Sequence, residues 1–381
     1  MHICEGVEHN HIQRAERIAI KVGSSLLINS KTGELNRGWF DAFIKDVAAL
    51  RQAGKEVIII SSGAVALGRR TLGVVPDADR PDKTEASACA AVGQIELAHA
   101  YQDALKDYNI PVGLILITTQ NTEIRSMYLN LRDTTDTLLA ANAIPVVNEN
   151  DAVSDRDDCY GDNDRLAARI AGMANADLLI LFSDIDGLYT DNPRRNPDAK
   201  FISIVDDISD DIHAMASGAG SNVGSGGMAT KLLAAVIARS AGCDMIITNG
   251  TVLHPLERVI NGGKLTYFPA GDAAKTARKH WIIGTPEPNG SVVIDKGAVK
   301  ALHSGSSLLP IGIKSVSGTF VRGDCVSVFD EKHNEIARGL AGYDSDEVFK
   351  ILGRHTKDIS KLLGYIRKGE FIHRNDLALY E

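Results

Sequence analysis

The chain has 381 residues, a length more typical of two domains than of one. Hydrophobic residues make up 44% of it and charged residues 24%, which is ordinary for a soluble globular protein. The formal net charge of −8 argues against broad, non-specific binding of nucleic acid by the whole surface.

The N-terminus and the cysteines favour a cytoplasmic protein. Residues 1–16 form a polar extension without the apolar stretch of a signal peptide, and no apolar run approaches the ~20 residues of a membrane span. His9 and His11 have no third ligand nearby, so we expect solvated side chains there and no metal site. The five cysteines lie scattered without a C-x-x-C pair, which predicts reduced thiols.

From residue 17 onward, short apolar runs alternate with longer helical patterns. Strands are expected over residues 17–22, 56–60, 111–117, 144–147, 178–182 and 245–247. Helices are expected over residues 39–53, 86–108, 133–142, 165–173 and 231–241. This alternation predicts an α/β domain over residues 17–272, with an open, mostly parallel sheet sandwiched by helices. In such sheets, ligands bind at the carboxyl ends of the strands.

The pattern changes near residue 272. A polar helix is expected over residues 272–281, and a Gly- and Pro-rich stretch follows, so residues 273–290 are interpreted as a linker. Beyond it, β-type runs are expected over residues 291–294, 312–316, 325–329 and 335–339. They predict a small β-rich domain over residues 291–381. From residue 288 onward, 13 Lys and Arg face 12 Asp and Glu, so this domain lacks the basic character of most RNA-binding domains.

The first two loops that follow strands offer two interpretations each. Lys21, at a buried strand end before Gly23-Ser24-Ser25, predicts an anion site, although a lysine side chain can also extend to the surface. Ser61-Ser62-Gly63-Ala64 predicts either a substrate loop or a plain N-cap for the next helix. The residues alone leave this second choice open.

The third loop is rich in carboxylates and amides. It reads Asn148-Glu149-Asn150-Asp151 and, later, Gly161-Asp162-Asn163-Asp164. Such groups can hold an ammonium group, which indicates an amino-acid substrate. The acidic residues between these two segments favour a solvated surface run. Asp162 and Asp164 are also suited to cap the helix expected at residue 165.

The last two loops suit a nucleotide. Ser183-Asp184 and Gly187-Leu188-Tyr189-Thr190, then Asp191-Asn192-Pro193-Arg194, follow a late strand, where such sheets often meet the nucleotide. Gly224-Ser225-Gly226-Gly227-Met228-Ala229-Thr230-Lys231 runs into a helix, whose free N–H groups and dipole favour phosphate. This is not a Walker A loop, because Leu232 follows the lysine where Ser or Thr would bind magnesium. The alternative is a glycine-rich turn before an ordinary helix.

Taken in order, these loops resemble the motifs of the amino-acid kinase family. The tail segment Ser304-Gly305-Ser306-Ser307-Leu308-Leu309-Pro310 resembles part of a PUA domain, a fold found in RNA-modifying enzymes. Two departures are small: Ser183 stands where Thr is usual, and the loop over residues 154–160 is unusually acidic. The resemblance implies the amino-acid kinase fold followed by a PUA-like domain.

The third loop resembles in particular the branch of the family that phosphorylates the γ-carboxylate of L-glutamate, the first step of proline biosynthesis. The resemblance implies ATP and Mg²⁺ as cofactors, L-proline as a feedback inhibitor and a homo-oligomer, either a dimer or a tetramer. It leaves RNA binding by the tail as an open role. It assigns catalysis to Lys21, Lys231 and Asp164, with Asp164 pairing with both lysines, and glutamate binding to Ser62, Asp151 and Asn163. It assigns ATP binding to Lys21, Ser183, Asp184, Ser225, Gly226, Gly227, Met228, Ala229, Thr230 and Lys231, and leaves the metal ligands unassigned.

Two other functions remain open from the sequence. One is a sister kinase of the same fold that acts on another carboxylate, a carbamate or a nucleotide. The other is an RNA-binding or RNA-modifying protein defined by its tail. The polar loop at Asn148 and the neutral charge of the tail favour the glutamate kinase over both.

Overall fold

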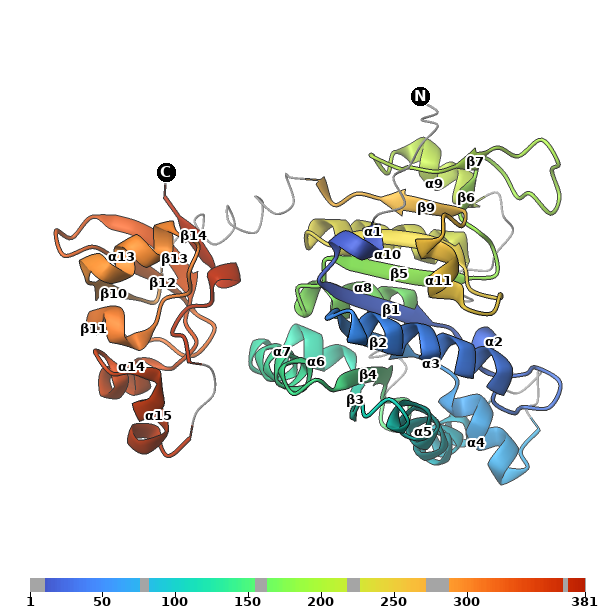
Figure 1. The fold of residues 1–381 in the computed structure, drawn as a ribbon, viewed down its shortest axis with the longest axis horizontal. Coiled ribbons are helices and arrows are strands. Elements are labelled where there is room, and N and C mark those ends of the chain that lie inside the picture. Colours follow the sequence, from blue (N-terminus) through green and yellow to red (C-terminus); the bar gives the residue numbers. More distant parts are fainter. Residues whose placement is uncertain are drawn as a thin grey trace. The chain divides into compact units, whose positions relative to one another are not determined.

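The computed structural model describes residues 11–75, 82–154, 163–217, 227–271, 288–365 and 369–380. The chain divides into two compact units, Met1–Asp272 and Ala273–Glu381 (Figure 1). The polar helix expected over residues 272–281 lies outside the described residues, as does most of the acidic loop over residues 154–160.

In the described part of the first unit, seven strands form one sheet in the order β3-β4-β2-β1-β5-β8-β9 (Figure 1). The strands are β1 (Arg17–Val22), β2 (Glu56–Ser61), β3 (Val112–Ile117), β4 (Ile144–Glu149), β5 (Leu178–Ser183), β8 (Asp244–Asn249) and β9 (Leu265–Phe268). All neighbouring pairs are parallel except β8 and β9. The mostly parallel sheet expected from the sequence is therefore confirmed, with one antiparallel edge strand that was not expected.

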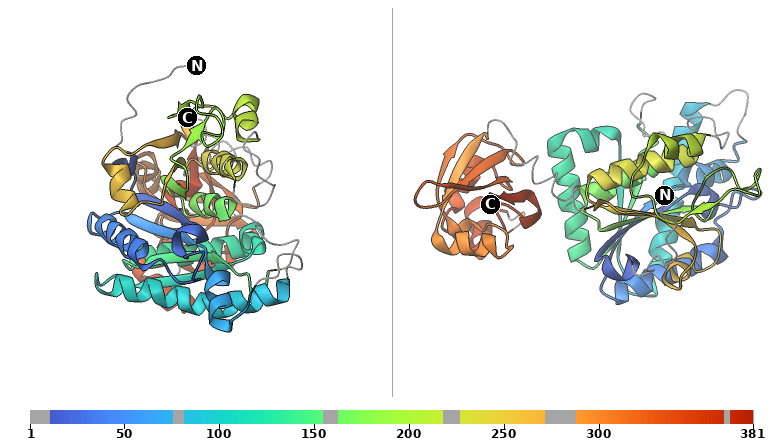
Figure 2. Two further views of the ribbon diagram at one scale, coloured as in Figure 1. Left: turned by 90° about the vertical axis from the view of Figure 1, so that its right-hand side faces the viewer. Right: turned by 90° about the horizontal axis from the view of Figure 1, so that it is seen from above.

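Helices cover both faces of this sheet (Figure 2). One face packs against α3 (Arg37–Gln52), α4 (Ala64–Leu72), α5 (Lys83–Lys106) and α11 (Pro255–Ile260). The other packs against α7 (Arg125–Ala140), α8 (Asn163–Met173), α9 (Asp210–Ser217) and α10 (Met228–Ser240). Side chains alternate along β1, so that Ile18 and Ile20 join the first core and Ala19 joins the second. By the same alternation Lys21 points to the face of α8 and α10.

Other parts of the first unit also differ from the sequence-based expectation. Helix α7 begins at Arg125, well before the expected residue 133, because Leu129 and Leu131 already bury their side chains. Helix α9 was not expected. The short helix α1 (His11–Arg14) places Ile12 in the first core, and His11 stacks on Tyr267 with ring centroids 3.8 Å apart. The end of the expected N-terminal extension therefore packs on the domain, and His11 is not simply solvated.

Two glycines bring α4 and α5 into backbone contact beneath the Ser62 loop. A Cβ atom on Gly68 would lie 1.8 Å from the carbonyl oxygen of Cys89, and one on Gly93 would lie 1.8 Å from that of Ala64. Helix α4 starts directly after Gly63, whose φ of 104° is a conformation that favours glycine. This packing fixes where the Ser62 loop leaves the sheet.

On the same face of the sheet as α4 and α5, the short helix α11 is held by a buried carboxylate. Asp46 of α3 accepts the backbone N–H groups of Leu256 at 3.0 Å and Glu257 at 3.2 Å. Its other oxygen lies 2.7 Å from Nδ1 of His254. Asp46 thus supplies the hydrogen bonds that an N-cap side chain provides at other helices.

A small hairpin lies outside the main sheet. Its strands β6 (Leu188–Tyr189) and β7 (Phe201–Ile202) are antiparallel. Leu188 belongs to the second core, so the base of the hairpin is packed on the domain. Its loop, residues 190–200, carries the Asp191-Asn192-Pro193-Arg194 stretch.

The described part of the second unit contains a five-stranded sheet in the order β11-β10-β12-β13-β14. The strands are β10 (Gly290–Ile294), β11 (Ile313–Gly318), β12 (Cys325–Phe329), β13 (Glu335–Leu340) and β14 (Leu377–Leu379). The helices, which were not expected, are α13 (Lys296–His303), α14 (Ser345–Ile351) and α15 (Thr356–Leu363). Tyr343 and Phe371 lie in its core with side chains from the sheet and the helices, so the β-rich tail has a core of its own.

Among the residues described, no helix combines the length and the apolar composition needed to cross a membrane.

Candidate active site

Two lysines and one aspartate form a buried charged cluster at the carboxyl edge of the main sheet. Lys21 Nζ lies 2.6 Å from Oδ1 of Asp164, and Lys231 Nζ lies 3.0 Å from Oδ2 of the same carboxylate. Asp164 is completely buried, and the two lysines are 9% and 5% exposed. Lys21 therefore does not extend to the surface, which was the alternative left by the sequence.

Each member of this cluster is placed by a different element. Lys21 is the fifth residue of β1 and pairs in register with Ile60 of β2 and Leu181 of β5. Asp164 lies in the first turn of α8, and Lys231 lies one turn into α10. Because both helices cover the face to which Lys21 points, the three charges meet there.

The charge state of Asp164 follows from these contacts. Burial on its own raises the pKa of the carboxyl group, but the positive charges of Lys21 and Lys231 and their hydrogen bonds bring the net pKa below its ordinary value. The hydroxyl of Thr230 lies 3.2 Å from the same carboxylate. Asp164 is therefore an anion at neutral pH, and the cluster carries one net positive charge.

The Ser62 loop meets the start of α8. The side-chain amide of Asn163 donates to Oγ of Ser62, and the backbone N–H of Ser62 donates to the carbonyl of Val22 at 3.1 Å. The N-cap position of α4 is Gly63, without a side-chain cap. The N-cap interpretation of this loop is therefore wrong, since Ser62 contacts α8 instead.

Asp151 lies in the turn after β4 and, within the described residues, makes no hydrogen bond to Ser62 or Asn163. It lines a pocket of about 440 Å³ together with Glu149, Asn150 and residues of α5 and β3. Gln94 also lines this pocket, and its Oε1 accepts a hydrogen bond of 2.9 Å from the side-chain amide of Asn148 in β4. Burial raises the pKa of Asp151, because this half-buried carboxylate receives no compensating charge.

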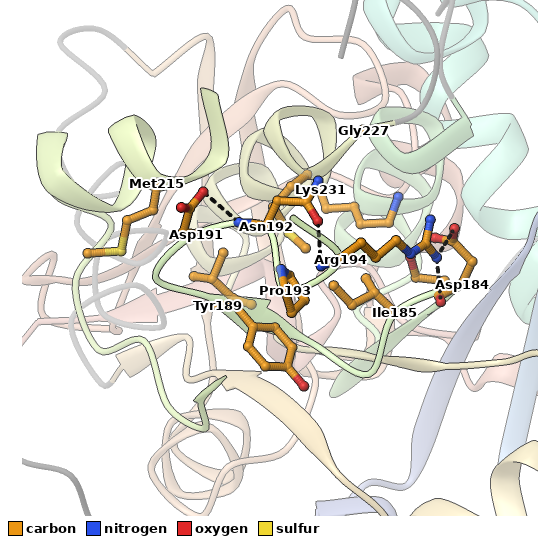
Figure 3. Close-up of a pocket in the computed structure, with 13 residues that line it drawn as sticks. Asp184, Ile185, Tyr189, Asp191, Asn192, Pro193, Arg194, Met215, Gly227 and Lys231 are labelled. Carbon is orange, nitrogen blue, oxygen red and sulfur yellow. Dashed lines mark hydrogen bonds and ion pairs between the residues drawn. The ribbon is translucent and has the colours of Figure 1, made fainter. Parts of the chain in front are cut away.

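A second pocket, of about 250 Å³, opens beside Lys231 (Figure 3). Five of the residues expected to hold a nucleotide line it: Ser183, Asp184, Gly227, Met228 and Lys231. Ala229 and Thr230 lie on the first turn of α10 and do not line it. Ser225 and Gly226 lie outside the described residues.

The same pocket is lined by further residues outside the set assigned to ATP binding. They are Ile185, Leu188, Tyr189, Asp191, Asn192, Pro193, Arg194 and Met215. Most come from the hairpin and its loop, which the sequence placed near the nucleotide. Met215 comes from α9, which was not expected. Figure 3 shows their apolar and polar side chains around one cavity.

Arg194 and Asp184 form an exposed ion pair at this pocket. Nη2 of Arg194 lies 2.8 Å from Oδ2 of Asp184 (Figure 3). Partial burial raises the pKa of Asp184, but the hydrogen bond and charge of Arg194 outweigh it and lower the net value. Because both side chains are exposed, this pair contributes little to stability and is free to rearrange around a ligand.

Comparison with known proteins identifies the family of this chain. Residues 16–249 match the amino acid kinase family and residues 290–363 match the PUA domain. A protein named glutamate 5-kinase from Paramagnetospirillum magneticum is 50% identical over 365 residues, covering 96% of this chain and 98% of the relative. Relatives of the same name from Agrobacterium fabrum and Brucella ovis are 48% and 51% identical, each over 95% of this chain and over 92% and 95% of their own lengths. The chain therefore belongs to the amino acid kinase family and, within it, to the glutamate 5-kinases.

Proposed function

We propose that the protein transfers the γ-phosphoryl group of ATP to the γ-carboxylate of L-glutamate, giving L-glutamyl 5-phosphate and ADP. This reaction is the first step of proline biosynthesis. The observation that carries the proposal is the buried cluster of Lys21, Asp164 and Lys231, which gives net positive charge beside the pocket that Lys231 lines. The relatives at about half identity bear the name of this reaction.

The acceptor needs no general base. A γ-carboxylate is already ionised at pH 7, so one of its oxygens attacks the γ-phosphorus while the bond from that phosphorus to the bridging oxygen of ADP breaks. The difficulty is to bring two anions together and to stabilise charge on the transferred group. Lys21 from β1 and Lys231 from α10 approach from different elements, and Asp164 holds both ammonium groups in place.

The nucleotide is assigned to the pocket beside Lys231. The N-terminal turn of α10, beginning after Gly227, offers backbone N–H groups and the positive end of a helix dipole to phosphate. Ser183, Asp184 and the hairpin line the remainder of the pocket. A bound Mg²⁺ would neutralise charge on the β- and γ-phosphates, and we assign no protein ligand to it.

Glutamate is assigned to Ser62, Asn163 and Asp151, with Asp151 holding the substrate ammonium group. Asp151→Ala is expected to raise KM for glutamate about tenfold, with little change in kcat or in KM for ATP, because uniform binding is lost. Initial rates at varied glutamate and varied ATP measure this. A rise in KM for ATP alone would assign the turn after β4 to the nucleotide.

Since burial raises the pKa of Asp151, the wild-type KM for glutamate should also rise as the pH falls through that pKa and Asp151 loses its charge.

L-Proline is proposed as an inhibitor at the glutamate site. It lacks the γ-carboxylate but keeps an α-carboxylate and a ring ammonium group, which Ser62, Asp151 and Asn163 are assigned to bind. Inhibition should therefore weaken as glutamate rises. Rates measured over a matrix of proline and glutamate concentrations test this, and inhibition that does not depend on glutamate would indicate a separate site.

An ADP-release assay tests the choice of acceptor. Purified protein with ATP should release ADP rapidly with L-glutamate and much more slowly with L-aspartate, N-acetylglutamate or UMP. Preference for any of the last three would assign the chain to a sister kinase of the same fold.

Further parts of the proposal concern the tail and the assembly. All site residues in the described part of the chain precede residue 272, so we propose that Met1–Asp272 contains the whole catalytic site. A PUA-like tail is compatible with RNA binding, but its neutral charge does not favour it. We also propose a homo-oligomer in the cytoplasm, in keeping with five scattered cysteines that form no C-x-x-C pair.

A further inference from the structure

One buried hydroxyl on β9 joins both strands of the small hairpin to the main sheet. Oγ1 of Thr266 accepts the backbone N–H of Leu188 in β6 at 2.7 Å and donates to the carbonyl of Ile202 in β7 at 2.6 Å. Thr266 is completely buried. The hydroxyl therefore uses its donor and its acceptor at once, each on a different strand of the hairpin.

The hairpin is fitted closely around this hydroxyl. A Cβ atom on Gly187, directly before β6, would lie 2.3 Å from Oγ1 of Thr266 and 2.8 Å from Cε2 of Phe201. Beyond β7, the N–H of Val205 donates to the carbonyl of Tyr267 at 2.9 Å, so the chain stays on β9 for three more residues. Glycine at position 187 thus permits the contact that Thr266 makes.

The hairpin held by Thr266 contributes several residues to the pocket beside Lys231. Tyr189 at the end of β6 lines the pocket beside Lys231, and so do Asp191, Asn192, Pro193 and Arg194 of the hairpin loop (Figure 3). The loop is tied to the strands by the hydrogen bond from the N–H of Thr190 to the carbonyl of Lys200, at 2.9 Å. The position of this pocket wall therefore depends on where the base of the hairpin is held.

We infer that Thr266 is a positioning residue for the nucleotide: its hydroxyl holds the hairpin so that the loop forms one wall of the ATP pocket. This inference rests on the proposed assignment of ATP to that pocket. Removing the hydroxyl leaves the buried N–H of Leu188 without its partner, which favours an undocked hairpin. Apparent affinity for ATP falls in proportion to the docked fraction.

Thr266→Val tests the inference, because valine keeps the branched shape and loses the hydroxyl. We expect KM for ATP to rise about tenfold, equivalent to about 1.4 kcal/mol, with KM for glutamate and kcat within about twofold of wild type. Thr266→Ser restores the hydroxyl and should return KM for ATP to within about threefold of wild type. An unchanged KM for ATP in Thr266→Val would overturn the inference.

Thr248→Val is the matched control. Thr248 on β8 is also completely buried and donates its hydroxyl to the carbonyl of Lys264 at 2.9 Å. It pairs in register with Leu265 and so faces the opposite side of the sheet from Thr266, which pairs with Ile247. Both valine variants should lower the melting temperature, but only Thr266→Val should raise KM for ATP. An equal rise of KM for ATP in both variants would show general loosening and overturn the inference.

Two further measurements keep the test decisive. If Thr266→Val does not fold, Gly187→Ala disturbs the same contact from the hairpin side and should raise KM for ATP in the same way. Direct titration of wild type and variant with ATP, without any acceptor, separates the two proposals. Weaker ATP binding in the variant supports the inference even if glutamate is not the acceptor, whereas equal binding contradicts it while leaving glutamate phosphorylation intact.

Discussion

Lys231→Ala is expected to lower kcat about a hundredfold, a loss of about 3 kcal/mol of transition-state stabilisation. Lys231 lies one turn into α10, at the pocket and 3.0 Å from the carboxylate of Asp164. Its charge acts where negative charge develops on the transferred phosphoryl group, so kcat should fall much more than KM for glutamate rises. Steady-state kinetics with both substrates varied measure the two effects.

Arg239→Ala is the control for this substitution. Arg239 lies in the last turn of the same helix, so its removal deletes one positive charge at the far end of α10. It should leave kcat within about twofold of wild type. A Lys231→Ala enzyme within about threefold of the wild-type kcat would contradict the role given to Lys231.

Asp164→Asn is expected to damage both stability and catalysis. The substitution leaves two buried ammonium groups next to a neutral amide, and breaking a buried ion pair in this way costs about 3–5 kcal/mol. Because the lysines then repel each other, kcat should fall at least as far as in Lys231→Ala, about a hundredfold. Chemical denaturation and kinetics on the folded fraction measure the two effects separately.

The stability effect of Asp164 has a defined pH dependence. Its folded-state pKa is lowered, so its ionised form stabilises the fold above the unfolded-state pKa of about 3.9, and this contribution is lost as the pH falls through the folded-state pKa. The difference in unfolding free energy between wild type and Asp164→Asn should therefore be constant near neutral pH and shrink in acid. A difference that grows in acid would contradict the ion-pair account.

Asp46→Asn is the matched control for Asp164→Asn. Asp46 is also a buried aspartate, but it holds α11 on the opposite face of the sheet. Its substitution should lower stability while leaving kcat within about twofold of wild type. Equal loss of kcat in both variants would mean that Asp164 acts through the fold alone.

The sequence predicted those parts of the site that follow strands directly. Lys21, Ser62 and Ser183 end or follow β1, β2 and β5, and alternation of apolar runs with helices is enough to place them at one edge. The glycine-rich segment before Lys231 was also predicted from the sequence, because a glycine-rich loop followed by a helix is a local pattern typical of phosphate sites. The ion pairs of Asp164 with both lysines were expected only from the family resemblance.

The remaining parts depend on contacts between distant segments. Ser62 contacts Asn163, 101 residues away, so the sequence could not separate a substrate loop from an N-cap. Thr266 contacts Leu188 across 78 residues, and a threonine in a short strand carries no sign of such a contact. Helix α9 and its Met215 were missed because the helix has only 8 residues, so that Ile212, Met215 and Ala216 are its only apolar residues at helical spacing beside Ala214.

The most direct measurement identifies the product. The protein is incubated with ATP, L-glutamate and hydroxylamine, which converts an acyl phosphate into a hydroxamate, and the product is identified by mass spectrometry against authentic α- and γ-glutamyl hydroxamates. The account predicts γ-glutamyl hydroxamate, formed in step with ADP and nearly absent with Lys231→Ala. ADP release without any hydroxamate, or formation of the α-hydroxamate, would contradict transfer to the γ-carboxylate.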